Sequence, residues 1–214
     1  MACCPNTVST DAAGDRPGYR RILWIVLTIN ALMFLVEILA GLAAGSAALQ
    51  ADALDFFADA ANYAISLFVL SLSLRWRATA ALIKGISLAL FGIWILVTVA
   101  WHGAQGTVPA WSTMGWVGAA ALIANLACLA LLYAWRHGDA NRRSVWICSR
   151  NDVLANLAVL AAALGVFGTG AGWPDLVVAG IMALLALQGA VTIVRQALAE
   201  LRSLERGRSS LQTS

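Results

Sequence analysis

Three aspartates within one otherwise apolar stretch are the residues of this sequence most suggestive of chemistry. Asp52, Asp55 and Asp59 are spaced at i, i+3 and i+7, so that on a helix all three share one face. The surrounding residues are typical of a membrane-spanning helix, where one ionised side chain near the bilayer centre costs about 2.5–3.5 kcal/mol. Three such side chains on one helix need compensation. The pattern therefore indicates that this face of the helix binds a cation.

A second acidic position lies in another apolar segment. Cys148 and Asp152 are spaced at i, i+4, the same spacing as Asp55 and Asp59. If the two pairs face each other, they supply three carboxylates and one sulfur, enough for a four-coordinate site. Zn²⁺ accepts such a tetrahedral set of oxygen and sulfur ligands and needs no redox chemistry. The competing interpretation, that these acids pair with Arg150 or bridge helices, leaves most of their negative charge unmatched.

The composition predicts a polytopic membrane protein. Hydrophobic residues make up 61% of the 214 residues and charged residues only 12%, and the mean hydropathy is +0.79. Apolar stretches of the length that spans a bilayer recur along the chain. We predict an all-α bundle of six transmembrane helices at about 21–44, 47–74, 78–101, 113–135, 144–168 and 174–198.

The basic residues alternate along this predicted topology. Of the 14 Lys and Arg residues, 13 lie at alternate ends of the predicted spans: at the start of the first, around the second and fourth links, and at the end of the last. In this interpretation Arg75, Arg77 and Lys84 surround the second link. The positive-inside rule then places both termini in the cytoplasm of a multi-pass protein of the inner (plasma) membrane. No basic tract carries interleaved aromatic residues, which argues against nucleic-acid binding.

The same topology divides the chain into three parts. Residues 1–20 form a cytoplasmic tail that includes Cys3 and Cys4, 21–201 the transmembrane domain, and 202–214 a short cytoplasmic tail. The last segment is too short for a core of its own, so we expect no C-terminal domain. Cys3 and Cys4 could bind metal or be acylated, but adjacent cysteines in such a tail more often do neither.

Three segments resemble the cation diffusion facilitator family. The run Gly45-Ser46-Ala47-Ala48-Leu49-Gln50-Ala51-Asp52-Ala53-Leu54-Asp55-Phe56-Phe57-Ala58-Asp59 is similar to that family's second transmembrane helix. Asn151-Asp152-Val153-Leu154-Ala155-Asn156 resembles its fifth helix, and Trp173-Pro174-Asp175 the entry to its sixth. The resemblance extends from Arg21 to about Leu201. It implies a secondary active exporter that exchanges cytoplasmic divalent metal for protons, usually as a homodimer.

The resemblance also implies a ligand set, which falls on Asp55, Asp59, Cys148 and Asp152. Most members of the family have His at the position of Cys148, and a thiolate there would favour Zn²⁺ and Cd²⁺ over Mn²⁺. Asn151, Asn156 or water could replace Cys148 as the fourth ligand. Without a C-terminal domain, a homodimer would have to form through the membrane helices. The metal is the transported substrate, and no cofactor is expected.

Two other functions compete with metal export. A passive cation channel would arrange its acids as a ring and would not couple flux to protons. An intramembrane aspartyl hydrolase would share a proton between Asp59 and Asp152, but three clustered acids suit a cation better, and no Gly-rich catalytic signature surrounds either residue. We therefore expect a transporter and not an enzyme. For Glu37 in the first span, lining of the ion path and hydrogen bonding between helices both stay open.

Overall fold

A computed structural model describes residues 17–69, 73–133 and 140–212, without the side chains of 17, 19, 69, 140–151 and 205–212. These residues form six α-helices and one π-helical segment. The elements are α1 (Pro17–Ala44), α2 (Ala47–Ala64), the π-helical η2 (Ile65–Val69), α3 (Leu74–Gln105), α4 (Trp111–Tyr133), α5 (Ala140–Thr169) and α6 (Trp173–Gln212). Each predicted span thus corresponds to a helix, and the all-α fold class is confirmed.

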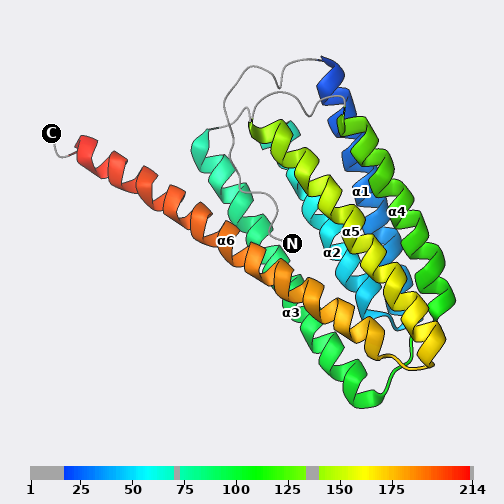
Figure 1. Cartoon of the computed structure of the whole chain (residues 1–214). Helices are drawn as coiled ribbons and strands as arrows, with labels where there is room; N and C mark the ends of the chain where they lie inside the picture. Colours follow the sequence, from blue (N-terminus) through cyan, green and yellow to red (C-terminus); the bar gives the residue numbers. More distant parts are fainter. Residues whose placement is uncertain (1–16, 70–72, 134–139, 213–214) are drawn as a thin grey trace.

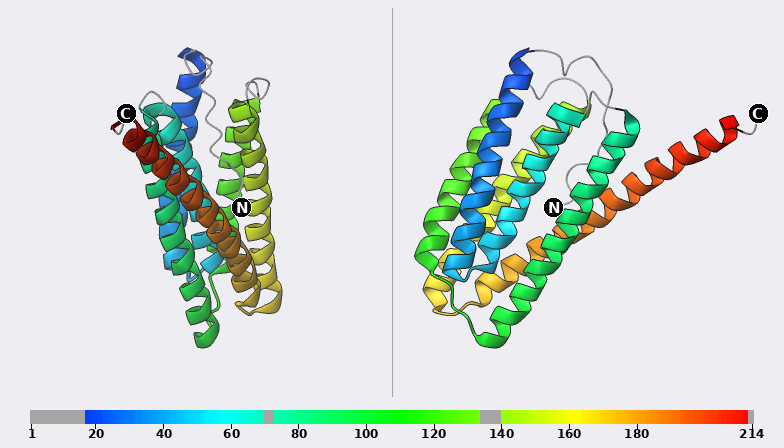
Figure 2. Two further views of the ribbon diagram at one scale, coloured as in Figure 1. Left: turned by 90° about the vertical axis from the view of Figure 1, so that its left-hand side faces the viewer. Right: turned by 180° about the vertical axis from the view of Figure 1, so that it is seen from behind.

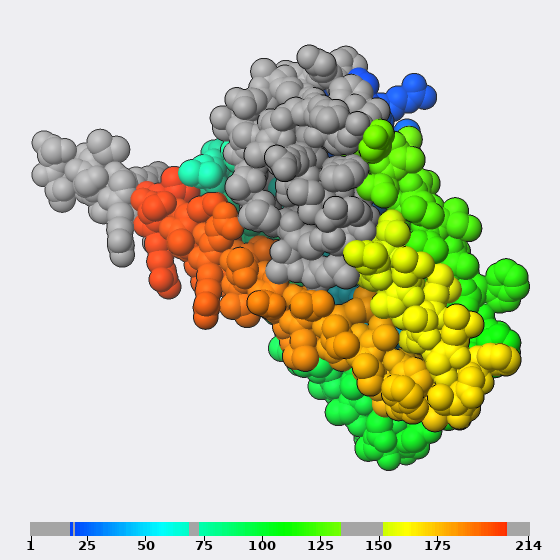
Figure 3. All heavy atoms as spheres, in the orientation of Figure 1, coloured from blue at the N-terminus to red at the C-terminus, as the bar shows by residue number. Residues whose placement is uncertain are grey.

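The helices form two groups (Figures 1 and 2). α1, α2, α4 and α5 lie side by side, while α3 and α6 cross each other along one side of that group. α2 packs against α1, α3, α5 and α6. The helix that carries the three aspartates is therefore the central element of the bundle. α6 continues past the bundle at its C-terminal end, as the space-filling view shows (Figure 3).

Glycines permit the close crossing of α3 and α6. A Cβ atom added at Gly85 would lie 2.8 Å from Val194, and one added at Gly92 would lie 2.8 Å from Leu187. These two glycines are seven residues apart and so fall on one face of α3. Small residues at helix crossings allow backbones to approach, as is common in membrane bundles.

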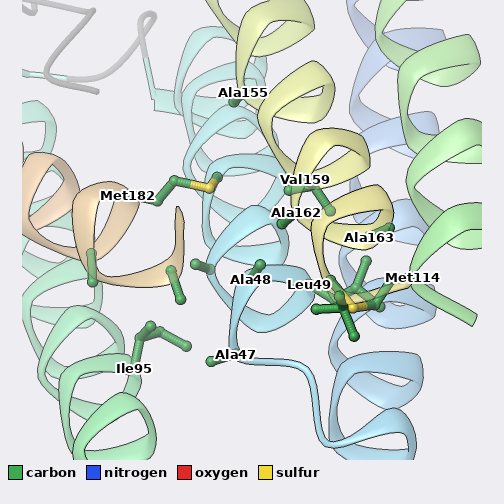
Figure 4. Packing of buried hydrophobic residues seen from close by; sticks show 14 residues of the cluster. Ala47, Ala48, Leu49, Ile95, Met114, Ala155, Val159, Ala162, Ala163 and Met182 are labelled. Atoms are coloured by element: carbon green, nitrogen blue, oxygen red, sulfur yellow. The ribbon is translucent and has the colours of Figure 1, made fainter. Parts of the chain in front are cut away.

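Small and medium apolar side chains fill the centre of the bundle around the start of α2 (Figure 4). Ala47, Ala48 and Leu49 form the first turn of α2 and belong to one buried cluster with Ile95 of α3 and Val159 of α5. α4 and α6 contribute Met114 and Met182. Because five helices contribute to this cluster, the N-terminal end of α2 has a fixed position in the bundle.

The distribution of polarity is that of a membrane protein. Large apolar side chains point outward, among them Trp116, which is 81% exposed, and Leu164, which is 71% exposed. Polar side chains lie inside, and among the described residues these are Asn30, Glu37, Ser46, Gln50, Asp52, Asp59, Lys84, Asn125, Asp152, Asn156 and Asp175. A soluble domain has the reverse distribution. The surface of the bundle therefore suits lipid.

Five helices of the described chain are long and apolar enough to cross a membrane: α1, α3, α4, α5 and α6. α2 is not among them, because its three aspartates lower its mean hydropathy. The multi-pass membrane assignment is thus confirmed in its main features. One detail is corrected: Lys84, expected among the basic residues that surround the second link, does not lie at the end of a helix. It lies well inside α3 and is only 6% exposed.

Candidate metal centre

α2 presents its aspartates to the interior of the bundle. Asp52 is completely buried and Asp59 is 9% exposed, while Asp55 is partly buried. The helix is regular through all three residues, so the predicted spacing on one face is retained. Since α2 contacts four other helices, these carboxyl groups lie where side chains of several elements can meet them.

Asp59 meets the other predicted acidic ligand directly. Its carboxyl group forms a side-chain hydrogen bond with Asp152 of α5. The Tyr63 hydroxyl, one turn further along α2, donates to Asp59 Oδ2 across 3.2 Å. The structure therefore brings together one predicted ligand from α2 and one from α5. Tyr63, which is 3% exposed, fixes the orientation of the Asp59 carboxylate.

The other two predicted ligands are less closely associated. Asp55 acts electrostatically on Asp52, and Asp59 acts on Asp55 in turn. Cys148 lies within α5, so its i, i+4 spacing to Asp152 is retained, but its side chain lies outside the described residues. Among the side chains that are described, no three His, Cys, Asp or Glu residues group closely enough to hold one ion.

A buried cation lies beside these acids. Lys84 Nζ on α3 donates a hydrogen bond to Asn62 Oδ1 on α2, and the Lys84 ammonium interacts electrostatically with Asp59. The charge pattern of the sequence groups Lys84 with the basic end of a span, and so it did not predict this role. The position of Lys84 in the apolar run of α3, with a polar Asn62 on the neighbouring helix, was the available signal. The ammonium group partly offsets the negative charge of the site.

A second polar network lies about two turns from Asp59, towards the N-terminal end of α2. The carboxyl groups of Glu37 on α1 and Asp52 on α2 lie within hydrogen-bonding reach of each other. Asn156 Nδ2 on α5 donates to Asp52 Oδ2 across 2.7 Å, and Asn125 Nδ2 on α4 donates to Asn156 Oδ1 across 3.0 Å. Both ends of the Asn156 amide are thus engaged, which leaves Asn156 poorly placed to replace Cys148 as a ligand. The sequence did not pair Glu37 with Asp52.

The start of α2 is fixed by an acid from α6. The Ser46 hydroxyl donates to Asp175 Oδ1, and the Ala47 and Ala48 N–H groups donate to the same carboxylate at 2.8 and 3.0 Å. The Ser46 Oγ atom in turn accepts from Leu49 N. Unpaired N–H groups at a helix start need such acceptors. The Gly-Ser and Trp-Pro-Asp segments noted in the sequence therefore meet in space.

Carboxyl oxygens from α2 and α5 thus converge inside an apolar bundle, with a tyrosine and a lysine beside them. Such groups suit a divalent cation, whose charge compensates the buried carboxylates.

A family model described as the cation efflux transmembrane domain matches residues 23–202. No curated protein matches the chain. The matched range contains every polar residue described above and most of each helix.

Proposed function

The chain belongs to the cation efflux (cation diffusion facilitator) family, and on that basis we propose that it exports divalent transition-metal cations, Zn²⁺ and Cd²⁺ above all, in exchange for protons. Membership in the family makes it a membrane transporter of metal cations. The observation that supports the site most directly is the hydrogen bond between Asp59 and Asp152. It joins the two helices on which the ligands were predicted.

The proposed ligands are Asp55, Asp59, Cys148 and Asp152. Asp59 and Asp152 are already adjacent, and Asp55 is one helical turn from Asp59 on the same face. A divalent cation between α2 and α5 would replace the proton that joins Asp59 to Asp152, because metal ligands must be deprotonated. Competition between metal and protons for the same carboxylates is the physical basis of the proposed antiport.

We further propose that α2 also spans the membrane, which brings the number of spans from five to six. Both termini are then cytoplasmic. α2 has 18 residues and η2 continues it for 5; together they extend about 34 Å, enough to cross the hydrocarbon core. The start of α1, the start of α3 and the end of α6 lie towards one end of the bundle (Figures 1 and 2). Exposed Arg20, Arg75 and Arg202 lie near those ends, as the positive-inside rule requires.

We also propose that the protein lies in the inner (plasma) membrane and forms a homodimer. A homodimer of this chain would use the outward apolar faces of its membrane helices, which are extensive. Crosslinking of the protein in native membranes, followed by gel electrophoresis, tests the dimer. A protein that stays monomeric at every crosslinker concentration would contradict it without affecting the transport proposal.

Transport by purified protein in vesicles tests the function. We expect Zn²⁺ flux that rises when the side receiving the metal is acidified relative to the other side at fixed membrane potential, because protons then release the metal there. Asp55→Ala and Asp59→Ala should each abolish flux while the protein still inserts. Glu200→Gln, at the far end of α6, is the matched control and should transport normally.

The same assay separates the competing functions. Zn²⁺ flux that is unchanged by the pH gradient would favour a passive channel over an antiporter. Near-normal flux in either aspartate variant would contradict the site itself. The hydrolase alternative shares the Asp59–Asp152 hydrogen bond, but it predicts peptide cleavage and no metal flux.

A further inference from the structure

We propose that Glu37 and Asp52 form a proton-binding site separate from the metal ligands, and that the proton held there is exchanged when metal binds. This inference rests on the proposed antiport and identifies two residues that would carry its proton. The two residues come from different helices, α1 and α2, and both are completely buried. Neither belongs to the proposed ligand set.

The hydrogen-bond accounting points to a proton. An ionised carboxylate only accepts hydrogen bonds, so a bond between two carboxyl groups requires a proton on one of them. Glu37 and Asp52 lie within hydrogen-bonding reach of each other. While both groups are ionised, neither Glu37 oxygen nor Asp52 Oδ1 has a hydrogen-bond partner among the described residues. A shared proton would therefore form a hydrogen bond between carboxyl oxygens that have no other partner among the described residues.

The negative charge of the Glu37–Asp52 pair also indicates a bound proton. Two ionised carboxylates at zero exposure are strongly unfavourable without a cation. The buried Lys84 interacts with Asp59, whereas the charges that act most strongly on Glu37 and Asp52 are their own and that of Asp55. α4 and α5 contribute neutral amides next to Asp52, those of Asn125 and Asn156. One proton shared by the pair removes half of its negative charge.

The orientation of Asn156 favours a proton over a second metal ion. Its oxygen is engaged by Asn125, so it presents its N–H group to Asp52. An amide N–H donor stabilises a carboxylate oxygen but repels a metal ion approaching the same oxygen. A metal centre at this position would need amide oxygens turned towards it. The Asn125–Asn156–Asp52 chain of hydrogen bonds presents the opposite polarity.

The pair is close enough to the metal ligands to be coupled to them. Asp52 precedes Asp55 by three residues on one face of α2, a rise of about 4.5 Å, and Asn156 follows Asp152 by four residues on α5. Asp55 acts electrostatically on both Glu37 and Asp52. A divalent cation bound at Asp55 would reverse the sign of that influence. Metal binding would then release the proton of the pair, and reprotonation would favour metal release.

Counting the protons released on metal binding tests the proposal. Titration calorimetry of the purified protein with ZnCl₂, in buffers of different ionisation enthalpy, gives the number of protons released per bound ion. Glu37→Gln and Asp52→Asn keep the shape of the pair but cannot hold the shared proton. Each should release about one fewer proton per bound ion than the wild type, with Zn²⁺ still bound. An unchanged proton count in a folded variant would overturn the proposal.

Infrared spectra test the same proton without metal. The wild-type protein should show the carbonyl stretch of a protonated carboxyl group, and its intensity should fall in Glu37→Gln and in Asp52→Asn. Asp59→Asn should lose Zn²⁺ binding while it retains the contribution of the Glu37–Asp52 pair. If the wild type binds no metal, the transport proposal fails while the infrared result still decides the proton site. Two Zn²⁺ ions per wild-type chain and one in Glu37→Gln would show that the pair binds metal instead.

Discussion

The Ser46 hydroxyl at the start of α2 donates a hydrogen bond to Asp175 Oδ1 at the start of α6 across 2.6 Å. The same carboxylate accepts the first two free N–H groups of α2, those of Ala47 and Ala48. α2 contains all three aspartates of the polar interior, so Asp175 positions them without touching them. Asp175 therefore fixes the start of the helix that carries the three aspartates.

Removal of this acceptor should destabilise the protein. We expect Asp175→Ala to lower the free energy of unfolding by about 1–3 kcal/mol, because buried N–H groups at the start of α2 lose their partner. Ser46→Ala should cost less, since Asp175 still accepts from Ala47 and Ala48. Thermal unfolding in detergent, followed by tryptophan fluorescence, measures the difference. Thr169→Ala, at an exposed hydroxyl, is the control, and an Asp175→Ala protein as stable as that control would contradict the role.

Tyr63 should matter for metal binding without being a ligand. Its hydroxyl donates to Asp59 Oδ2, and hydrogen bonds of this kind hold a ligating carboxylate in one orientation. We expect Tyr63→Phe to weaken Zn²⁺ binding by about 10-fold or more, with little change in stability. Thr192→Ala removes an exposed hydroxyl on α6 and serves as control. Equal Zn²⁺ affinity in Tyr63→Phe and the control would show that the Asp59 orientation does not depend on the tyrosine.

Lys84 should oppose metal binding. Its ammonium group interacts with Asp59, so a divalent cation at Asp59 must bind next to a positive charge. We expect Lys84→Met to tighten Zn²⁺ binding by about tenfold or more, because two unit charges even about 10 Å apart interact by roughly 1.5 kcal/mol at an effective dielectric constant near 20. Lys84→Arg retains the charge and should resemble the wild type. Calorimetric titration measures the affinities.

Weaker Zn²⁺ binding in Lys84→Met than in Lys84→Arg would contradict this role of Lys84. It would mean that the ammonium group organises the site instead of competing with the ion. In vesicles, tighter binding in Lys84→Met should also slow release, so that maximal flux falls while the half-saturating Zn²⁺ concentration falls as well.

The elements of the fold were predictable because local patterns determine them. Apolar stretches of spanning length gave six helices, and Gly45 and Gly106, both with positive φ, end helices where glycines break the apolar runs. The shared face of Asp55 and Asp59 follows from helical spacing alone. The family resemblance, which rested on the Asp-rich second helix, is confirmed by the match over residues 23–202.

The pairing of polar groups was not predictable, because it depends on how the helices pack. Glu37 and Asp52 are fifteen residues apart in sequence, and nothing local indicates that α1 and α2 place them in contact. Lys84 was misassigned because the positive-inside rule treats every basic residue near a span end as topogenic. Its burial depends on Asn62 and Asp59 of another helix. The four-ligand metal site stays a prediction.

Cys148 is the position where this chain departs from the pattern of its family, and a substitution series tests its role. If the thiolate is a ligand, Cys148→Ser should weaken Zn²⁺ binding and should weaken Cd²⁺ binding more, because a hydroxyl is a harder and poorer donor. Cys148→His should retain Zn²⁺ binding, since imidazole suits zinc in the same tetrahedral position. Calorimetric titration of both metals against each variant measures the two effects.

Cys128 supplies the matched control for that series. It is a buried thiol on α4 that contacts Asn30 Nδ2 at 3.6 Å and lies outside the proposed ligand set. Cys128→Ser should leave the ratio of Cd²⁺ to Zn²⁺ affinity unchanged, whereas Cys148→Ser should lower it. If Cys148→Ala binds both metals as the wild type does, Cys148 is a small apolar packing residue. Asp55, Asp59 and Asp152 would then hold the ion with water or Asn151 as the fourth ligand.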